Sequence, residues 1–255
     1  MKKIDLVNLI KKQKLNYSLD QAFYVNDDIF ELDIKNIFSK QWVFVGHVSR
    51  IPNYGDYFLF NIGKESIIIV RDNDGSVHAH YNVCRHRGSH ICLENEGNSK
   101  VLICPYHAWT YNLNGSLKGA RLMDKNFKKE QWKLHSCNTK IFEGLIFINL
   151  SDKPNDFDEF IAPTKKFIEF HGLSDAKIAH RQYYPTDGNW KLTLDNFHEC
   201  YHCQPSHPEY CQVHDKDYII AYGAGSNTGP SSEKFDNILS NWNKKVEKLG
   251  HITGE

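Results

Sequence analysis

Residues 84–92 read CRHRGSHIC and residues 104–111 read CPYHAWTY, and these two stretches decide what the middle of the chain folds into. Each begins with a cysteine that a histidine closely follows: Cys84 with His86, and Cys104 with His107. Each pair comes at the end of an apolar segment that reads as a strand. Two strand-end loops can hold a metal centre between them, so the spacing predicts a site of two cysteines and two histidines.

Two kinds of metal site use this set of ligands. In a [2Fe-2S] cluster of mixed ligation, two thiolates hold one iron and two imidazoles hold the other. A structural zinc site can use the same residue types, but zinc fingers pair cysteine with cysteine and histidine with histidine. Here each loop supplies one residue of each type. The pattern therefore favours the cluster and leaves zinc as the alternative.

The segments around these loops are short, apolar and evenly spaced. From Trp42 onward they read WVFVGHV, DYFLFNI, SIIIVRD, VHAHYNV, VLICPY and LIFINL. Turn signals separate them, such as PNYG at 52–55, DNDG at 72–75 and NG at 114–115. Short strands at this spacing predict a small antiparallel sandwich or barrel over residues 41–150.

The sequence on either side of this β domain has helical periodicity. Helices are expected at residues 27–40, where Asn26 or Asp27 would be the cap, and also at residues 157–170 and 189–203. A strand is expected at residues 178–184. Together these elements predict an α+β protein.

A second group of metal-binding residue types lies at the end of the last predicted helix. On a helix, Asp195, Glu199 and His202 would share one face, at positions i, i+4 and i+7. Pro205 is expected to end that helix and to let His207 return toward His202. Two imidazoles and one carboxylate form the ligand set of non-haem Fe(II) oxygenases, which leaves positions for O2 and substrate.

Other interpretations of this second group remain open. A single histidine among apolar neighbours is more often a core residue than a ligand. Cys200 and Cys203 form a C-x2-C pair, which is half of a common zinc site. Because no second pair of thiols follows, we interpret these two cysteines as packing residues.

Together, the two groups resemble the large (alpha) subunit of the Rieske non-haem iron oxygenases. The run CRHRGSHIC…CPYHAWTY is similar to the Rieske domain of that family, and the pattern E-x-Y-H-x4-H at residues 199–207 is similar to its iron-site helix. The resemblance implies three parts: a helical segment at residues 1–40 that packs on the catalytic domain, an all-β Rieske domain at 41–150, and the N-terminal part of a helix-grip-like α+β catalytic domain at 151–255.

The resemblance also implies roles for single residues. Cys84, His86, Cys104 and His107 would hold a [2Fe-2S] cluster, and His202 and His207 would hold a mononuclear Fe(II). Glu199 would link His202 of one subunit to His107 of a neighbour, which implies a homotrimer, and Asp195 is a further catalytic candidate.

The third ligand of the mononuclear iron stays unassigned. In the family it is an aspartate about 100 or more residues after the second histidine. None of the carboxylates after His207 lies at that spacing: Glu209, Asp215, Asp217, Glu233, Asp236, Glu247 and Glu255.

The implied function is that of a terminal oxygenase. A separate flavin and iron–sulfur reductase would deliver electrons from NAD(P)H, and the oxygenase would activate O2 and oxidise a small organic substrate. The segment of Glu199 followed by Cys-Tyr-His-Cys is similar to monooxygenases of the carnitine and betaine type, which act on quaternary ammonium compounds. Two alternatives are an aromatic ring-hydroxylating dioxygenase and a Rieske ferredoxin-like electron carrier, which would leave His202 and His207 without a role.

The resemblance also bears on the potential of the cluster. In Rieske proteins of respiratory complexes, cysteines occupy the positions of Ser89 and Tyr106 and a serine occupies that of Trp109. Fewer hydrogen bonds to sulfur stabilise the reduced state less, so we expect a midpoint near the low end of the Rieske range, about −150 mV.

Composition excludes several other classes of protein. Lys plus Arg and Asp plus Glu both number 31, and the zero net charge argues against nucleic acid as a partner. No apolar run approaches the ~18 residues of a membrane span, and residues 10–20 lack the core of a signal peptide. Seven cysteines, an odd number, argue against a disulfide scaffold. A cytoplasmic location is therefore expected.

Overall fold

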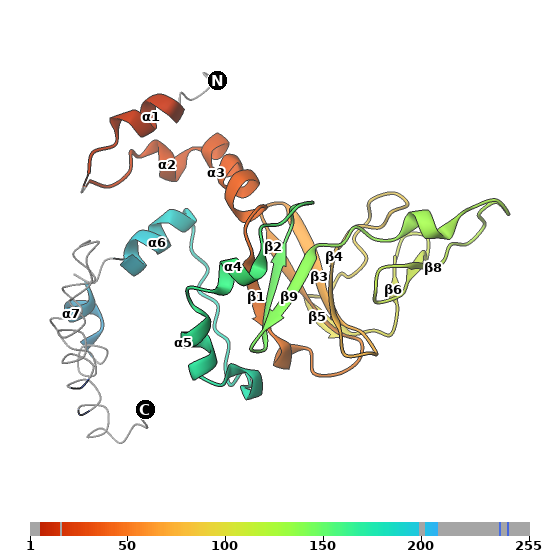
Figure 1. Ribbon diagram of the computed structural model, residues 1–255. Coiled ribbons are helices and arrows are strands. Elements are labelled where there is room, and N and C mark those ends of the chain that lie inside the picture. The colour runs from red at the N-terminus through yellow and green to blue at the C-terminus, as the bar shows by residue number, and fades with distance from the viewer. Residues whose placement is uncertain (1–5, 16, 199–201, 209–239, 241–243, 245–255) are drawn as a thin grey trace. The chain divides into compact units, whose positions relative to one another are not determined.

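The computed structural model describes residues 6–15, 17–198, 202–208, 240 and 244 (Figure 1). The chain divides into two compact units. Residues 31–184 form one, and the described parts of residues 1–30 and 185–255 form the other. Every described strand lies in the first unit. The expected α+β class, with a mostly β domain around the cysteine loops, is confirmed.

The strands form three antiparallel sheets. The first has the order β1-β10-β9: Val43–His47, Leu145–Asn149 and Asn138–Phe142. The second has the order β4-β3-β2-β5: Val77–Tyr81, Glu65–Arg71, Asp56–Ile62 and Glu96–Asn98. The third has the order β6-β7-β8: Leu102–Ile103, Thr110–Tyr111 and Leu117–Gly119. All six apolar segments of the sequence contain a strand, whereas β5, β7, β8 and β9 were not predicted.

Strand β3 explains why the three sheets stack. Its side chains alternate, so that Ile67 and Ile69 pack toward the first sheet while Ile68 and Val70 pack toward the third. All four are fully buried. Burial of such a side chain contributes roughly 1.5–3 kcal/mol. A strand that is buried on both faces needs apolar residues at successive positions, which accounts for the unbroken run in this segment.

A helix covers the outer face of the first sheet. Helix α4 (Phe157–Ile161) packs its two terminal residues against Trp42 and Phe147. The Trp42 indole donates a hydrogen bond to the Asn155 carbonyl at 2.9 Å. Figure 1 shows α4 on the opposite side of the sheets from β6 and β8, so the cysteine loops lie at the far end of this unit.

Two predicted helices are present in altered form. The first is α3 (Asp27–Asp33), which continues as a π-helix at Ile34–Phe38, and Asn26 Oδ1 caps it by accepting from the Ile29 N–H at 3.0 Å. The expected helix at 157–170 is divided into α4 and α5 (Lys165–Phe170). The division falls at Pro163, which has no N–H for a helical hydrogen bond.

The remaining helical elements are short. The α-helices are α1 (Leu6–Lys12), α2 (Ala22–Val25), α6 (Trp190–His198) and α7 (Cys203–Ser206), of which α1 and α2 lie in the helical segment expected at residues 1–40. Turns of 3-10 helix lie at Val48–Arg50, Lys129–Trp132 and Leu173–Asp175.

The predicted strand at residues 178–184 is wrong. This segment pairs with no strand in the part of the chain that the structure describes. Side chains hold it instead: the Ile178 N–H donates to Ser49 Oγ at 3.3 Å, and Arg181 pairs with Glu96 at 3.0 Å. The composition of this segment therefore did not report that no neighbouring strand among the described residues is available to it.

Candidate functional site

The first cysteine loop is closed by two backbone hydrogen bonds. The Cys84 N–H donates to the Ser89 carbonyl at 2.8 Å, and the Gly88 N–H donates to the Cys84 carbonyl at 3.0 Å. Gly88 has a φ of 74°, in the left-handed region that glycine enters without a steric penalty. The turn therefore directs Cys84 inward, where the side chain is buried.

The second loop repeats this turn residue for residue. The Cys104 N–H donates to the Trp109 carbonyl at 2.8 Å, and the Ala108 N–H donates to the Cys104 carbonyl at 3.0 Å. Ala108 stands where the first loop has glycine and adopts a φ of 57°. Cys104 is buried as its counterpart is. The two loops therefore present their cysteines in the same way.

The four predicted ligands converge. The ring centroids of His86 and His107 are 4.6 Å apart, with the ring planes at 75°. The Cys84 thiol interacts with the Cys104 thiol, and burial is the main cause that raises the pKa of Cys84. Binding to iron would remove that thiol proton, because the ligand is a thiolate.

The chemistry of the donors fits a two-iron cluster. His86 Nδ1 is buried and has no hydrogen-bond partner, and a buried nitrogen in that state is stabilised when it binds something else. Partial desolvation, and then the charges of His107 and Arg87, lower the pKa of His86 and favour the neutral form that binds iron. Two imidazoles and two buried thiols are the donor set of a [2Fe-2S] cluster of mixed ligation.

Tyr111 contacts one of the sulfur ligands. Its hydroxyl lies 3.3 Å from Cys84 Sγ and accepts the Arg85 N–H at 3.1 Å. Burial is the first cause that raises the pKa of Tyr111, so the hydroxyl keeps its proton and can donate a hydrogen bond to a thiolate sulfur at this distance. Sequence reasoning missed this residue, although it closes the quoted stretch CPYHAWTY. The sequence feature that could have indicated it is a hydroxyl-bearing side chain on β7, two residues after the second loop.

Trp109 shields one face of His86. The two rings are stacked with centroids 5.0 Å apart and planes within 8°. On its other sides Trp109 meets Phe127 and Trp132, each at 5.6 Å between ring centroids. At the position where Rieske proteins of respiratory complexes carry a serine, the molecule thus has a fully buried aromatic ring.

Two further cysteines of this unit take no part in the site. Burial raises the pKa values of Cys92 and Cys137 to about 12. Cys92 lies in the same apolar core as Cys84 and Cys104, and Cys137 lies in the core between the first two sheets. They therefore act as small apolar residues, although Cys92 ends the first quoted stretch.

The second group of predicted ligands lies in the other unit. The ring centroids of His202 and His207 are 5.5 Å apart, with planes at 80°. The structure therefore brings together the two imidazoles that were predicted to share an iron. Glu199 lies outside the described residues, as do Cys200 and all the carboxylates considered after His207.

The local helices differ from those expected. Helix α6 spans Trp190–His198, and α7 begins anew at Cys203. Pro205 does not end a helix but lies in the first turn of α7, where a missing N–H costs little. The His207 N–H donates to the Cys203 carbonyl at 2.8 Å, which returns His207 toward His202.

Helix α6 carries apolar side chains that the described residues do not cover. Leu192, Leu194 and Phe197 are exposed, Phe197 by 79%. The buried residue is Lys191. The described part of the chain therefore supplies no core for the apolar side of α6.

Asp195 has a partner in the N-terminal segment. The Tyr24 hydroxyl donates to Asp195 Oδ2 at 2.7 Å, and burial and this hydrogen bond raise the pKa of Tyr24. The contact ties α2 to α6 within one unit. It gives Asp195 a structural partner, and its catalytic role stays a prediction.

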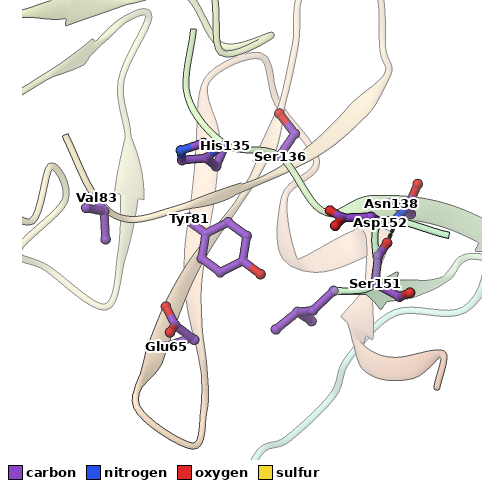
Figure 2. Close-up of a pocket in the computed structure, with 9 residues that line it drawn as sticks. Glu65, Tyr81, Val83, His135, Ser136, Asn138, Ser151 and Asp152 are labelled. Atoms are coloured by element: carbon purple, nitrogen blue, oxygen red, sulfur yellow. Dashed lines mark hydrogen bonds between the residues drawn. The ribbon is translucent and has the colours of Figure 1, made fainter. Parts of the chain in front are cut away.

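A polar pocket lies beside the first ligand loop (Figure 2). It has a volume of about 560 Å³ and is lined by Glu65, Tyr81, Val83, His135, Ser136, Asn138, Leu150, Ser151 and Asp152. Burial, Cys137, and the carboxylates of Glu65 and Asp152 raise the pKa of Tyr81 to about 12. The Arg85 guanidinium contacts the His135 imidazole at its rim. None of the predicted ligands lines this pocket, so it is separate from the metal sites.

The sequence matches two family models. Residues 41–138 match the Rieske [2Fe-2S] domain, and residues 173–236 match the catalytic domain of ring hydroxylating alpha subunits. The first match contains all four predicted cluster ligands and the second contains both histidines of the predicted iron site. None of the described helices is both long and apolar enough to cross a membrane.

Curated and solved proteins give the same result. The glycine betaine monooxygenase oxygenase subunit of Pseudomonas aeruginosa (strain UCBPP-PA14) is 38% identical over 203 residues, which are 79% of this chain and 47% of the relative. A solved structure of a quaternary ammonium Rieske monooxygenase also matches, with a TM-score of 0.69 and 34% identity, over 75% of this chain and 53% of that one. That structure is described in terms of carnitine oxidation by gut microbiota and inter-subunit electron transfer.

An arene-oxidising enzyme is also similar. Naphthalene 1,2-dioxygenase from Rhodococcus sp. matches with a TM-score of 0.72 and 30% identity, over 82% of this chain and 50% of that one. The chain spans about half the length of the curated relatives it matches.

Proposed function

Because this chain belongs to the Rieske-type non-haem iron oxygenases, as part of an alpha subunit, we propose that it serves a terminal oxygenase that uses O2 to oxidise a quaternary ammonium compound of the betaine or carnitine type. The observation that carries the proposal is the convergence of Cys84, His86, Cys104 and His107 on two equivalent loops. The relatives' substrates support the ammonium compound over an arene.

Two thiolates and two imidazoles would hold the cluster, one pair on each iron. His202 and His207 would hold the mononuclear iron together with a carboxylate that stays unassigned. The metals supply the redox chemistry when bound. The protein's own part is to orient the four donors through the two turns, to donate the Tyr111 hydrogen bond to Cys84, and to exclude water from one face of His86 with Trp109.

Glu199 is proposed to join the two metal sites across subunits. Its carboxylate would accept one N–H from His202 and another from His107 of a neighbouring subunit, which requires a trimer. A carboxylate between two metal-bound imidazoles fixes the orientation and tautomer of both rings. His107 supports this role because its side chain is exposed at the surface of its loop.

Electrons would come from NAD(P)H through a separate flavin and iron–sulfur reductase. A cytoplasmic location is part of the proposal, since reducing conditions keep thiols such as those of Cys92 and Cys137 out of disulfides.

The first test is the metal content of the protein prepared without oxygen. The proposal expects two irons and two sulfides in the cluster, with mixed-ligand visible absorption, and a further iron per chain. A Rieske ferredoxin-like carrier would contain no iron beyond the cluster. Colourless protein with zinc as its only metal would defeat the proposal.

The second test addresses Glu199. Glu199→Ala should leave both metals bound but reduce substrate oxidation by at least about a hundredfold, because the link between the sites is cut. Glu169→Ala, which removes an exposed carboxylate on α5, is the control and should have full activity. Unchanged oxidation by the Glu199 variant would refute the bridge.

A substrate screen separates the two candidate substrate classes. The naphthalene dioxygenase similarity favours an arene as the second candidate. Oxygen uptake with betaine or carnitine, and none with naphthalene, would support the ammonium compound. The reverse result would support the arene.

A further inference from the structure

A segment next to the cluster site carries a marked excess of positive charge. We name residues 118–133 the basic arm. It contains two carboxylates, Asp124 and Glu130, and six cations: Lys118, Arg121, Lys125, Lys128, Lys129 and Lys133. The whole chain has zero net charge. Positive charge is therefore concentrated on this arm and not spread over the molecule.

The cations of the basic arm are available to a partner. All six are exposed. Within the part of the chain that the structure describes, none of them forms an ion pair, and Lys129 Nζ donates only to the Lys118 carbonyl, at 3.3 Å. Six exposed cations without carboxylate partners create a positive potential that steers an acidic molecule toward the arm.

The basic arm is joined to the cluster site through aromatic rings. Phe127 and Trp132, both on the arm, contact Trp109, and Trp109 is stacked on His86. Phe127 and Trp132 also stack on each other at 5.6 Å. A partner seated on the arm is therefore separated from a cluster ligand by two ring-to-ring steps.

The arm presents an apolar tip between its cations. Leu122 is 97% exposed and Met123 is also exposed. Leu122 has a φ of 59°, a left-handed conformation that is unfavourable for a leucine. Figure 1 shows the yellow-green connection after β8, which includes this tip, projecting away from the sheets. An apolar centre within a charged rim is the usual anatomy of a protein interface.

We propose that the basic arm is the docking surface for the acidic face of the electron-donating protein. The inference rests on the proposed oxygenase function and names the surface that its electron donor uses. Net charge distinguishes the two candidate partners of the arm. A second copy of this chain has zero net charge, whereas an acidic electron carrier has the negative charge that complements the arm. The arm's contact with Trp109 then places the carrier near His86, so one electron passes from the reduced carrier to the oxidised cluster.

The test uses the iron-loaded protein and a reduced plant-type [2Fe-2S] ferredoxin as the acidic probe. Such a ferredoxin is a stronger reductant than a mixed-ligand cluster. Stopped-flow absorbance measures the second-order rate of cluster reduction over a range of salt concentrations. Photoreduced deazaflavin, a small donor that needs no docking surface, is the reference donor. Calorimetric titration of the two oxidised proteins measures binding without any electron transfer.

The chain offers a closely matched pair of variants. Lys128→Glu/Lys129→Glu reverses two adjacent exposed lysines on the arm, and Lys165→Glu/Lys166→Glu reverses two adjacent exposed lysines on α5. Both change the net charge by the same amount. The arm variant should lower the ferredoxin rate and affinity at low salt by about tenfold or more and flatten their salt dependence. The α5 variant should change them less than about twofold, and deazaflavin should reduce all three proteins alike.

The possible failures are distinct. Equal effects of the two double variants, or rates that do not depend on salt, would overturn the docking surface while leaving a reducible cluster and the oxygenase function intact. A changed oligomeric state of the arm variant would assign the arm to contacts between copies and equally overturn the proposal. A protein that deazaflavin cannot reduce would refute the proposed function itself.

Discussion

The two ligand loops have the same backbone but different surroundings. The loops at 84–89 and 104–109 are closed by equivalent hydrogen bonds, and each buries its cysteine. Their histidines differ, since His86 is half-buried under Trp109 whereas His107 is exposed. The comparison teaches that the turn fixes the geometry of the ligands, while the residues around each turn decide what a ligand can touch. The exposed histidine is the one that a neighbouring molecule can reach.

The largest expected effect tests the equivalence of the loops. Cys84→Ser and Cys104→Ser should each abolish the visible absorption of the cluster, because a hydroxyl is a poor substitute for a soft thiolate. Cys92→Ser is the control: this cysteine is buried outside the ligand set and the variant should keep the spectrum. A normal spectrum from one loop variant but not from the other would show that the loops are not equivalent.

The ligand loops were the part that the sequence could predict. A cysteine and a histidine close together at the end of a strand form a local pattern, and each turn is closed by hydrogen bonds between residues near in sequence. The contacts of Tyr111 and Trp109 depend on how the third sheet packs over both loops, and no spacing along the chain reports that. The same reasoning explains the failed strand at residues 178–184, whose partner is not a local property.

The iron-site segment shows the limit of periodicity more clearly. Apolar spacing predicted a helix through residue 203, whereas His202 lies outside a helix and α7 begins at Cys203. Periodicity finds a face on which residues align, but it does not report where a helix starts. The pairing of His202 with His207 was nevertheless predicted correctly, because the two lie only five residues apart.

The second prediction concerns what holds the two loops together. His80 lies on β4, which leads into the first loop, and its ring bonds the Leu113 carbonyl beyond the second loop and Ser136 Oγ, both at 2.8 Å. Burial lowers the pKa of His80 from 6.5 to about 4. Between pH 6.5 and pH 4 the unfolded chain therefore binds a proton at His80, whereas the folded protein does not. The stability that is fully present above pH 6.5 is lost as the pH falls toward 4.

The expected loss is about 3 kcal/mol of unfolding free energy, from the linkage between the pKa difference and stability. Denaturant titrations at pH 7 and pH 4 would measure it. His80→Gln removes this titration. Between pH 7 and pH 4 the free energy of unfolding of the variant should therefore fall by about 3 kcal/mol less than that of the unmodified protein. A variant with the same pH dependence as the unmodified protein would assign the acid lability to other groups.

The third prediction concerns the one hydrogen bond to sulfur that the structure shows on the first loop's cysteine. Tyr111→Phe removes the donor to Cys84 and should lower the midpoint potential by about 40 mV, the equivalent of a hydrogen bond of about 1 kcal/mol in a one-electron couple. Tyr81→Phe, on the neighbouring strand β4, is the control and should not change the potential. Redox titration with dye mediators measures both, and an unchanged Tyr111 variant would place the tuning elsewhere.

The smallest effect comes from the left-handed position of each loop, which is glycine in the first and alanine in the second. Gly88 and Ala108 hold equivalent left-handed conformations, but only alanine has a Cβ that opposes it. A Cβ at Gly88 would meet no atom within 4 Å, so strain alone should make Gly88→Ala destabilising, by about 0.5–1 kcal/mol. Ala108→Gly should stabilise by a similar amount, because relief of strain exceeds the added entropy of the unfolded chain. Denaturant midpoints measure both changes. If they shift in the same direction for both variants, backbone strain at this position does not decide the stability of the two turns in the same way, although their hydrogen bonds match.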